Sequence, residues 1–191
     1  MTCIVAIENQ GQTILIGDSA GCNDDGLIEL RKDPKVFRRG EYLIGYTTSF
    51  RMGQLLHYNA EFPEPPEEAN LGPFMIREFV PAVRQAFADG GFIKTLHRGE
   101  TSPLNHWSER GQEWAGQFVI GVRGQLFVMG SDFQIGIPQL PYIAIGSGAK
   151  VAYGTLFATS HLGLEERAEL ALEAAAQHCT CVRPPFVTVR R

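Results

Sequence analysis

Residues 1–18 read MTCIVAIENQGQTILIGD, and this stretch decides the fold. Two short apolar runs, Cys3–Glu8 and Thr13–Gly17, flank the turn signal Gln10-Gly11, which predicts a β-hairpin. Neither run alternates between apolar and polar residues, and a strand that is apolar on both sides is covered on both faces. The sheet that contains this hairpin is therefore expected to lie between two other layers.

The rest of the chain continues as hairpins and helices. Tight turns join apolar runs within Lys35–Tyr46 and within Gln117–Met129, so each segment predicts a further hairpin. Tyr142–Ile145 and Val182–Val189 predict two more strands, the second interrupted by Pro184-Pro185. Apolar residues at helical spacing predict helices over Phe50–Asn59, Phe74–Ala88 (with a kink or break at Pro81), Ala149–Ser160 and Leu164–His178.

Repeated tight hairpins indicate antiparallel sheets, unlike the strand–helix alternation of a parallel sheet. Together with two pairs of helices, they favour an α+β fold: a four-layer αββα sandwich of two antiparallel sheets flanked by helices. Residues 1–191 are expected to form a single domain, because neither an internal repeat nor a linker divides the sequence. Glu61–Asn70 is predicted as a rigid acidic surface loop, and Lys94–Glu113 as a long loop or an irregular hairpin.

Composition excludes several classes of protein. The 191 residues carry a formal net charge of −4, with 44% hydrophobic and 20% charged residues. This is typical of a globular protein and provides no basic field for nucleic acid or anionic lipid. No apolar run has the length of a membrane span, and the N-terminus lacks the basic region of a signal peptide. The four cysteines, Cys3, Cys22, Cys179 and Cys181, are therefore expected to be reduced thiols in a cytoplasmic protein.

The first candidate for chemistry is Thr2. If Met1 is removed, Thr2 exposes an α-amine whose ordinary pKa lies close to neutral pH, so the amine can act as a base. It lies within reach of the hydroxyl of the same residue, and nucleophile and base then occupy one side chain. The alternative is an ordinary chain start, because many proteins begin with Met-Thr.

Two charged residues form the second candidate. Asp18 ends the second apolar run, and Lys35 opens the third after Asp33-Pro34. A lysine beside Thr2 would lower the pKa of the hydroxyl and of the amine, and Asp18 would keep that lysine charged inside a cleft. The alternative is a turn aspartate and a surface lysine.

The third candidate is Ser147, within Gly146-Ser147-Gly148 between a predicted strand and a predicted helix. Its hydroxyl could point at the Thr2 amine and relay protons. The alternative is a plain helix N-cap.

Taken in order, these residues resemble the proteasome β-subunit family, and the resemblance is greatest to the bacterial HslV-type peptidase branch. It covers the chain from Thr2 to about Cys179 and is weakest between Ala60 and Glu113. It rests on an ordered set: residues 2–7, Gly17-Asp18 sixteen residues after Thr2, Lys35-Val36, Ile44-Gly45-Tyr46, and the run IAIGSG at 143–148 ahead of an alanine-rich helix.

The resemblance implies an N-terminal-nucleophile hydrolase with an αββα sandwich. Thr2 would be both nucleophile and base, Lys35 and Asp18 would set the charge around it, and Ser147 would assist proton transfer. In this family a backbone N–H just after the Gly45 strand binds the oxyanion, and the matching position here is Thr48. No cofactor and no catalytic metal are implied.

The chain also departs from the family, as a divergent branch would. The family usually has glycine at the oxyanion position, where this chain has Thr47-Thr48, and threonine restricts φ and can reshape the pocket. The segment after the last helix keeps only Cys179 of the HslV-branch pattern, which puts in doubt the cation site often found there. The C-terminus shows no clear docking tail for an unfoldase, and Glu61–Asn70 is an unfamiliar addition.

Two other readings of the cysteines stay open. His178-Cys179-x-Cys181 could contribute ligands to a metal, although zinc sites need four ligands and usually space paired cysteines more widely. Cys3 could become the N-terminal nucleophile if trimming went one residue further.

The leading hypothesis is a threonine-type peptidase or amidohydrolase that cleaves peptide bonds with Thr2 in an oligomeric ring. Its partners would be a peptide or unfolded protein substrate and further copies of the chain, with or without an ATP-dependent unfoldase, and neither nucleic acid nor membrane. A second hypothesis is a catalytically inactive structural or binding subunit of the same fold that retains Met1. A third is an amidohydrolase that acts on a small molecule.

Overall fold

The computed structural model describes residues 2–23, 26–67, 70–92 and 116–191. Hydrogen-bonded neighbours follow the order β10-β1-β2-β11 in a four-stranded sheet and β5-β6-β7-β8-β9 in a five-stranded sheet, and β3 pairs with β4. The strands are β1 (Cys3–Asn9), β2 (Gln12–Gly17), β3 (Ala20–Cys22), β4 (Ile28–Leu30), β5 (Val36–Arg39), β6 (Tyr42–Tyr46), β7 (Phe118–Val122), β8 (Gln125–Met129), β9 (Ile135–Gly136), β10 (Tyr142–Gly146) and β11 (Val187–Arg190). The helices are α1 (Phe50–Gln54), η1 (Leu55–Asn59), α2 (Gly72–Phe74), η2 (Met75–Phe79), α3 (Val80–Asp89), α4 (Ala149–Ala158) and α5 (Leu164–His178).

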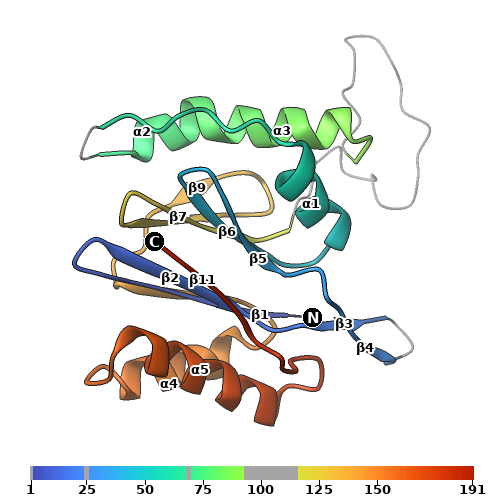
Figure 1. The fold of residues 1–191 in the computed structure, drawn as a ribbon, viewed down its shortest axis with the longest axis vertical. Coiled ribbons are helices and arrows are strands. Elements are labelled where there is room, and N and C mark those ends of the chain that lie inside the picture. The colour runs from blue at the N-terminus through green and yellow to red at the C-terminus, as the bar shows by residue number, and fades with distance from the viewer. Residues whose placement is uncertain (1, 24–25, 68–69, 93–115) are drawn as a thin grey trace.

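Figure 1 shows how these elements are stacked. Helices α2 and α3 lie along the outer side of the five-stranded sheet, the four-stranded sheet follows, and α4 and α5 lie beyond it. All pairings within the two sheets are antiparallel. The prediction of an α+β fold with antiparallel sheets is confirmed.

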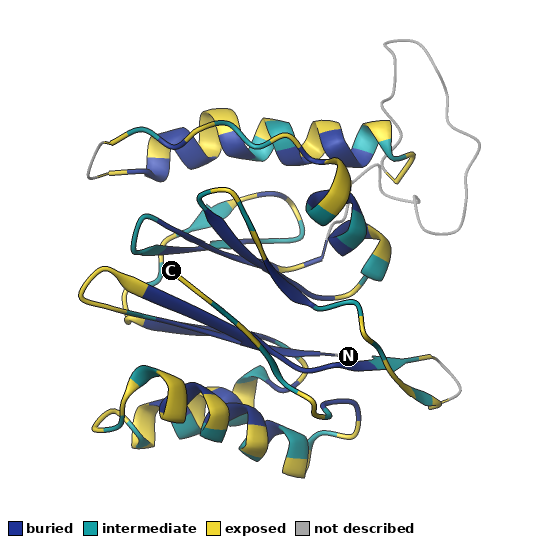
Figure 2. Ribbon diagram, in the orientation of Figure 1, coloured by how far each residue is buried: buried dark blue, intermediate teal, exposed yellow. Residues whose placement is uncertain are grey.

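Strand β1 explains why the first apolar run does not alternate. Ile4 and Ala6 belong to a buried cluster between the two sheets, whereas Cys3, Val5 and Ile7 belong to a cluster beneath α4 and α5. Both faces of the strand are therefore buried, and an apolar side chain is favoured at every position. Figure 2 shows the same pattern in the whole molecule, with buried strands inside and exposed outer faces on the helices.

The helices before β7 differ in detail from the prediction. The predicted helix Phe50–Asn59 divides into α1 and the π-helical turn η1, and Ser49 caps α1 by accepting the Met52 N–H. The predicted helix Phe74–Ala88 divides into α2, η2 and α3. Pro81 lies in the first turn of α3, directly after the π-helical turn η2. Phe79 and Val80 keep helical backbone angles, so the helix changes from π to α hydrogen bonding at the η2–α3 boundary and does not break there.

Other differences lie outside the predicted helices and strands. Strands β3, β4 and β9 were not expected, because the short polar runs that form them lack a clear strand pattern. The acidic loop Glu61–Asn70 is more than a surface loop: Phe62 stacks on Phe79, and the Tyr42 hydroxyl donates to the Pro63 carbonyl at 2.6 Å. The prediction for Lys94–Glu113 lies outside the described residues.

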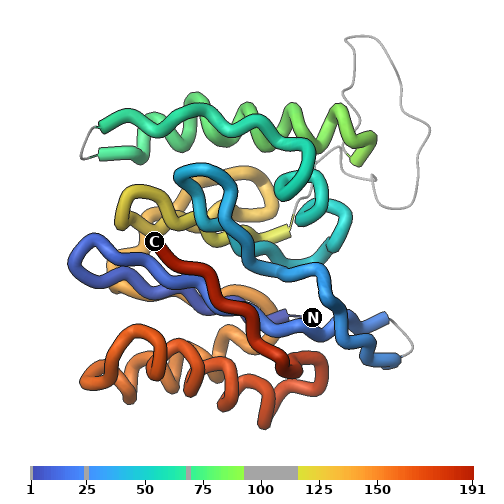
Figure 3. The backbone as a smooth tube through the Cα atoms, in the orientation of Figure 1, coloured from blue at the N-terminus to red at the C-terminus, as the bar shows by residue number. Residues whose placement is uncertain are grey.

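The prediction of four reduced thiols is wrong for two of the cysteines. Cys22 of β3 and Cys181, after α5, form a disulfide, and only Cys3 and Cys179 are free. The two bonded cysteines are 159 residues apart in the sequence, so only the fold brings them together. Figure 3 shows the segment after α5 turning back past the start of β3. Within the described ranges, no helix is long and apolar enough to span a membrane.

Candidate active site

The strand order brings the candidate residues to one end of the sheets. Thr2 precedes β1, Asp18 follows β2, and Ser147 follows β10. Strand β1 runs antiparallel to both β2 and β10, so its start meets the ends of both neighbours. Lys35 precedes β5 in the other sheet and reaches Asp18 from there.

Asp18 connects the other residues of the site. Its Oδ1 atom accepts hydrogen bonds from the Lys35 Nζ at 2.9 Å and from the Cys3 N–H at 3.0 Å, and its Oδ2 accepts the Ala20 N–H at 3.0 Å. The Asp18 and Lys35 side chains are 0% and 2% exposed. The expected ion pair is therefore present, and it is anchored one residue from Thr2 through the Cys3 backbone.

Burial has an electrostatic consequence for Lys35. Removal of the ammonium from water lowers its pKa, and the neighbouring Arg31 lowers it slightly further, while Asp18 opposes both effects. The net direction is downward from the ordinary lysine value. The ion pair with Asp18 is therefore the interaction that favours the charged form of Lys35 against burial.

Ser147 contacts the Thr2 backbone on both sides. The Thr2 N–H donates to Ser147 Oγ at 3.3 Å, and that hydroxyl donates to the Thr2 carbonyl at 3.3 Å. The Gly148 N–H also donates to the same carbonyl at 3.2 Å. Gly146 makes this approach possible: its φ is +93°, and a Cβ there would lie 2.2 Å from the Thr2 carbonyl oxygen. Thr2 itself is only 5% exposed, and its nitrogen is a peptide nitrogen while Met1 is attached.

Thr48 adopts a backbone conformation that favours glycine. Its φ is +79°, although threonine restricts φ and a β-branched residue in this region is strained by about 1–3 kcal/mol. Thr47 fixes the backbone beside it, because its N–H and its Oγ1 both donate to the Gln117 carbonyl and its Oγ1 accepts the Gln117 N–H. Tyr46, which ends β6, donates its N–H to the Lys35 carbonyl at 3.1 Å, so this loop begins beside the ion pair. Thr48 therefore holds a backbone conformation that favours glycine, at a cost in strain.

A second group of side chains around Lys35 was not predicted. Arg31 forms a two-point ion pair with Asp33 at 2.9 and 2.7 Å, and its guanidinium lies 3.9 Å from the centroid of the Phe50 ring. The Lys35 Nζ lies 5.8 Å from the same centroid. These residues stand in a polar stretch with no recognisable motif, so only the fold reveals that they surround Lys35.

The two alternative roles for the cysteines do not fit the structure. The Cys3 thiol is completely buried among the residues beneath α4 and α5, and burial raises its pKa to about 12. A thiol with so high a pKa is a poor nucleophile in this form of the chain, in which Met1 and Thr2 precede it. Cys181 is in the disulfide, and the described residues contain no cluster of three or more His, Cys, Asp or Glu side chains that could hold a metal. The alternative of metal ligands at His178-Cys179-x-Cys181 therefore loses Cys181 to the disulfide.

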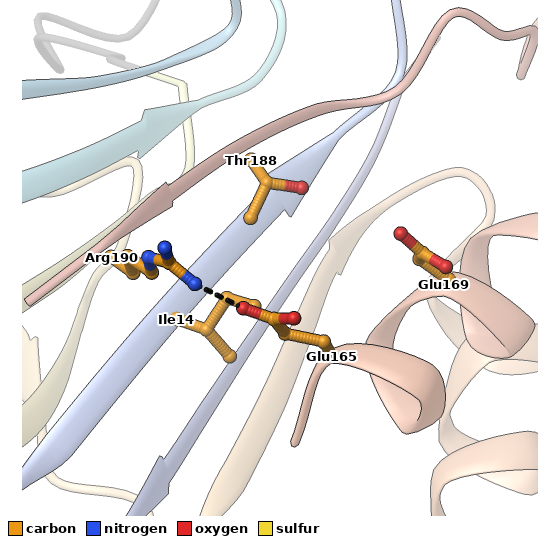
Figure 4. Close-up of a pocket in the computed structure, with 5 residues that line it drawn as sticks. All are labelled: Ile14, Glu165, Glu169, Thr188 and Arg190. Atoms are coloured by element: carbon orange, nitrogen blue, oxygen red, sulfur yellow. Dashed lines mark hydrogen bonds and ion pairs between the residues drawn. The ribbon is translucent and has the colours of Figure 1, made fainter. Parts of the chain in front are cut away.

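Two surface pockets lie away from these residues. One pocket has a volume of about 350 Å³ and lies between α5 and the edge of the four-stranded sheet. Figure 4 shows the side chains that line it, including the ion pair between Arg190 and Glu165. The other, of about 400 Å³, lies between residues 39–42 and 60–65. The pocket beside α5 is lined by Ile14, Glu165, Glu169, Thr188 and Arg190. Neither contains a candidate catalytic residue.

Solved structures share this arrangement over the whole chain. BPH from Thiobacillus denitrificans matches with a TM-score of 0.74 at 18% identity, covering 100% of this chain and 97% of BPH. The eukaryotic HslV from Trypanosoma brucei matches with a TM-score of 0.65 at 15% identity, covering 99% and 98%. The Gly-1 mutant of Anbu from Hyphomicrobium sp. strain MC1 also gives 0.65, at 18% identity, covering 99% and 80%.

No family model matches the chain, and no curated protein sequence does. At these identities the likeness is one of fold. The resemblance read from the sequence is confirmed at that level: the chain has the fold of the proteasome-type N-terminal-nucleophile hydrolases.

Proposed function

We propose that the chain is a threonine-type peptidase or amidohydrolase in which Thr2, after removal of Met1, is the nucleophile. The observation that carries this proposal is the Asp18 carboxylate, which is buried and bonded at once to Lys35 and to the backbone N–H that follows Thr2. A charged pair in this position would place a cation beside a hydroxyl that must lose its proton. The fold proposed with it is the four-layer αββα sandwich of an N-terminal-nucleophile hydrolase.

The reaction begins at the Thr2 hydroxyl. The free α-amine takes the hydroxyl proton, and Oγ1 forms a bond to the carbonyl carbon of the substrate amide. The carbonyl electron pair moves onto oxygen. When the carbonyl re-forms, the C–N bond breaks and the leaving amine takes the proton from the ammonium of Thr2. Water then attacks the ester with the amine as base, which releases the acid and restores the hydroxyl.

Three other residues have supporting roles in this proposal. The Lys35 cation, held by Asp18, stabilises the negative charge that develops on the Thr2 oxygen. The Ser147 hydroxyl, which contacts the Thr2 nitrogen, relays protons to and from the amine. The Thr48 backbone N–H donates to the oxyanion, and one such donor is typically worth about 10²–10³ in rate. Because that donor is backbone, the threonine side chain does not remove it.

The assembly and partners follow from the same proposal. Homo-oligomeric rings would enclose the active sites, and a peptide or unfolded protein, with or without an ATP-dependent unfoldase, would be the substrate in the cytoplasm. A mass measurement under native conditions tests the ring, and a stable monomer would contradict it.

The decisive experiment is an intact-mass measurement before and after exposure to epoxomicin, the compound present in one solved BPH complex. Epoxomicin is a peptide epoxyketone, which needs a hydroxyl and a free amine on one residue to form its adduct. We expect loss of Met1 and one adduct that maps to Thr2. The matched control is Thr2→Ala, which still allows removal of Met1 but lacks the hydroxyl, and it should give no adduct.

The other results separate the alternatives. Retained Met1 without an adduct would overturn the hydrolase proposal for this form of the chain and favour a structural subunit. Loss of Met1 without an adduct, together with cleavage of a small amide but of no peptide, would favour a small-molecule amidohydrolase.

A further inference from the structure

Three backbone carbonyls converge on one nitrogen atom just after α5. The Nη1 of Arg183 lies 3.0 Å from the Ala176 oxygen, 2.9 Å from the Cys179 oxygen and 2.7 Å from the Val182 oxygen. The three carbonyls belong to residues that are three apart in the sequence, and the backbone between them turns around the guanidinium. None of the three comes from a charged side chain, and the positive charge of Arg183 is what they surround.

Three carbonyl oxygens share the N–H groups of one nitrogen atom, as in the three-centre hydrogen bonds that are common at helix ends. A guanidinium Nη carries two N–H groups, yet three oxygens lie within 3.0 Å of it. Ala176 lies in the last turn of α5, where carbonyls lack a helical partner and the helix dipole favours a positive charge. Carbonyl oxygens are also the ligands that hard cations such as K⁺ and Ca²⁺ take in proteins.

We propose that Arg183 is a built-in substitute for a bound cation at this turn. The guanidinium occupies the place where a hard metal ion would bind the Ala176, Cys179 and Val182 carbonyls. It thereby makes the turn independent of metal ions. The consequence is specific: if the guanidinium is removed and the chain still folds, the same three carbonyls become a cation site.

This turn is tied to the candidate active site. The Arg183 carbonyl accepts the Ser19 N–H at 3.0 Å, and the Ser19 hydroxyl donates to the Pro185 carbonyl at 2.6 Å. Ser19 follows Asp18 directly, and the disulfide between Cys22 and Cys181 joins the same two segments. The turn that surrounds the Arg183 guanidinium is therefore bonded through its backbone to the segment that carries Asp18. The cation test below concerns the turn itself and does not depend on hydrolase activity.

The test compares thermal unfolding of wild-type protein and Arg183→Met in KCl, in CaCl₂ and in tetramethylammonium chloride at equal ionic strength. Methionine keeps the apolar stem and removes the charge. In tetramethylammonium chloride we expect the variant to lose about 5 °C in Tm. KCl or CaCl₂ should restore at least half of the loss, because an ion that binds only the folded state stabilises it. The wild-type Tm should be the same in KCl and in tetramethylammonium chloride.

The matched control is Arg190→Met, which removes an exposed arginine from β11 and changes the net charge equally. It should not respond to the choice of cation. The proposal is overturned if Arg183→Met shows no cation-specific recovery, or if wild type and Arg190→Met gain as much as Arg183→Met does.

Arg183→Lys covers the case in which the methionine variant does not fold in any of the salts. Its ammonium supplies three N–H groups for the three carbonyls, so it should fold, with a Tm that is independent of the cation. A lysine variant that also fails to fold, or whose Tm depends on K⁺ or Ca²⁺, would overturn the proposal.

Discussion

Replacement of Asp18 by asparagine tests directly how much the hydrogen bonds and the ion pair of this carboxylate contribute to stability. The carboxylate accepts three hydrogen bonds, two at Oδ1 and one at Oδ2. An amide has one acceptor oxygen. In one orientation the amide oxygen faces Lys35 and Cys3, and the NH₂ group then faces the Ala20 N–H. In the flipped orientation the NH₂ group faces the Lys35 ammonium. Either orientation sets a donor against a donor in a buried space.

The expected loss of stability is large because Lys35 is left without its anion. Removing one partner of a buried ion pair typically costs about 3–5 kcal/mol. For a domain of this size each kcal/mol lowers Tm by about 2–4 °C, which gives a fall of about 6–20 °C for Asp18→Asn. Lys35→Met should also destabilise the protein, because it leaves the Asp18 charge buried with only backbone donors.

The assay is equilibrium denaturation of both single variants and of the double variant Asp18→Asn/Lys35→Met. Once the charge pair is removed as a unit, the double variant should lose clearly less stability than the sum of the two singles, with a coupling energy of about 2 kcal/mol or more. A loss below about 1 kcal/mol for Asp18→Asn, or additive losses, would refute the reasoning.

The pH dependence supplies a second readout of the same variant. Burial lowers the Lys35 pKa in the folded protein, and Asp18→Asn removes the interaction that opposes this, so the pKa falls further. Between the folded pKa and the ordinary lysine value, the unfolded chain binds more protons than the folded chain, so stability rises with pH. The difference in free energy of unfolding between Asp18→Asn and the wild type should therefore become smaller as the pH rises from about 7 toward 10. A gap that stays constant over this range would contradict the pKa argument.

Three further predictions concern single residues. Thr48→Gly should raise the stability by about 1 kcal/mol in thermal unfolding, because glycine adopts the observed φ of +79° without strain, and a destabilised variant would contradict this. Gly146→Ala should lower Tm by several degrees, because the new Cβ would meet the Thr2 carbonyl, and an unchanged Tm would disprove the close approach. Iodoacetamide at mildly alkaline pH should label Cys179 and leave Cys3 unlabelled in peptide mass mapping, since burial raises the Cys3 pKa to about 12.

Local patterns were sufficient to predict most of the framework. The hairpin at residues 1–18 and the helix Leu164–His178 were predicted with nearly the observed bounds, because their apolar spacing reflects the faces that they bury. The pairing of Asp18 with Lys35 also followed from position, since each residue stands at the end of an apolar run. Their catalytic roles, with those of Thr2, Ser147 and Thr48, stay predictions.

The features that were missed depend on contacts between distant segments. The disulfide joins Cys22 to Cys181, and nothing local distinguishes these cysteines from Cys3 and Cys179. Arg183 is an ordinary arginine in the sequence, and only the turn after α5 gives it three carbonyl partners. At Thr48 the sequence drew attention to the position, but the residue type gives no sign that the backbone keeps a φ of +79°.

The buried charge pair is the strongest reason to expect chemistry at this end of the sheets. Fold stability alone does not require it, because well-packed apolar residues in place of a buried ion pair are often as stable or more stable. Asp18 and Lys35 nevertheless form a buried ion pair, and Asp18 is bonded to the N–H of the residue that follows Thr2, as expected where a charge serves a reaction. The double variant Asp18→Asn/Lys35→Met separates the two explanations. If it folds stably and processes Met1 but no longer reacts with epoxomicin, the pair serves the reaction, whereas full reactivity would show that the pair is only structural.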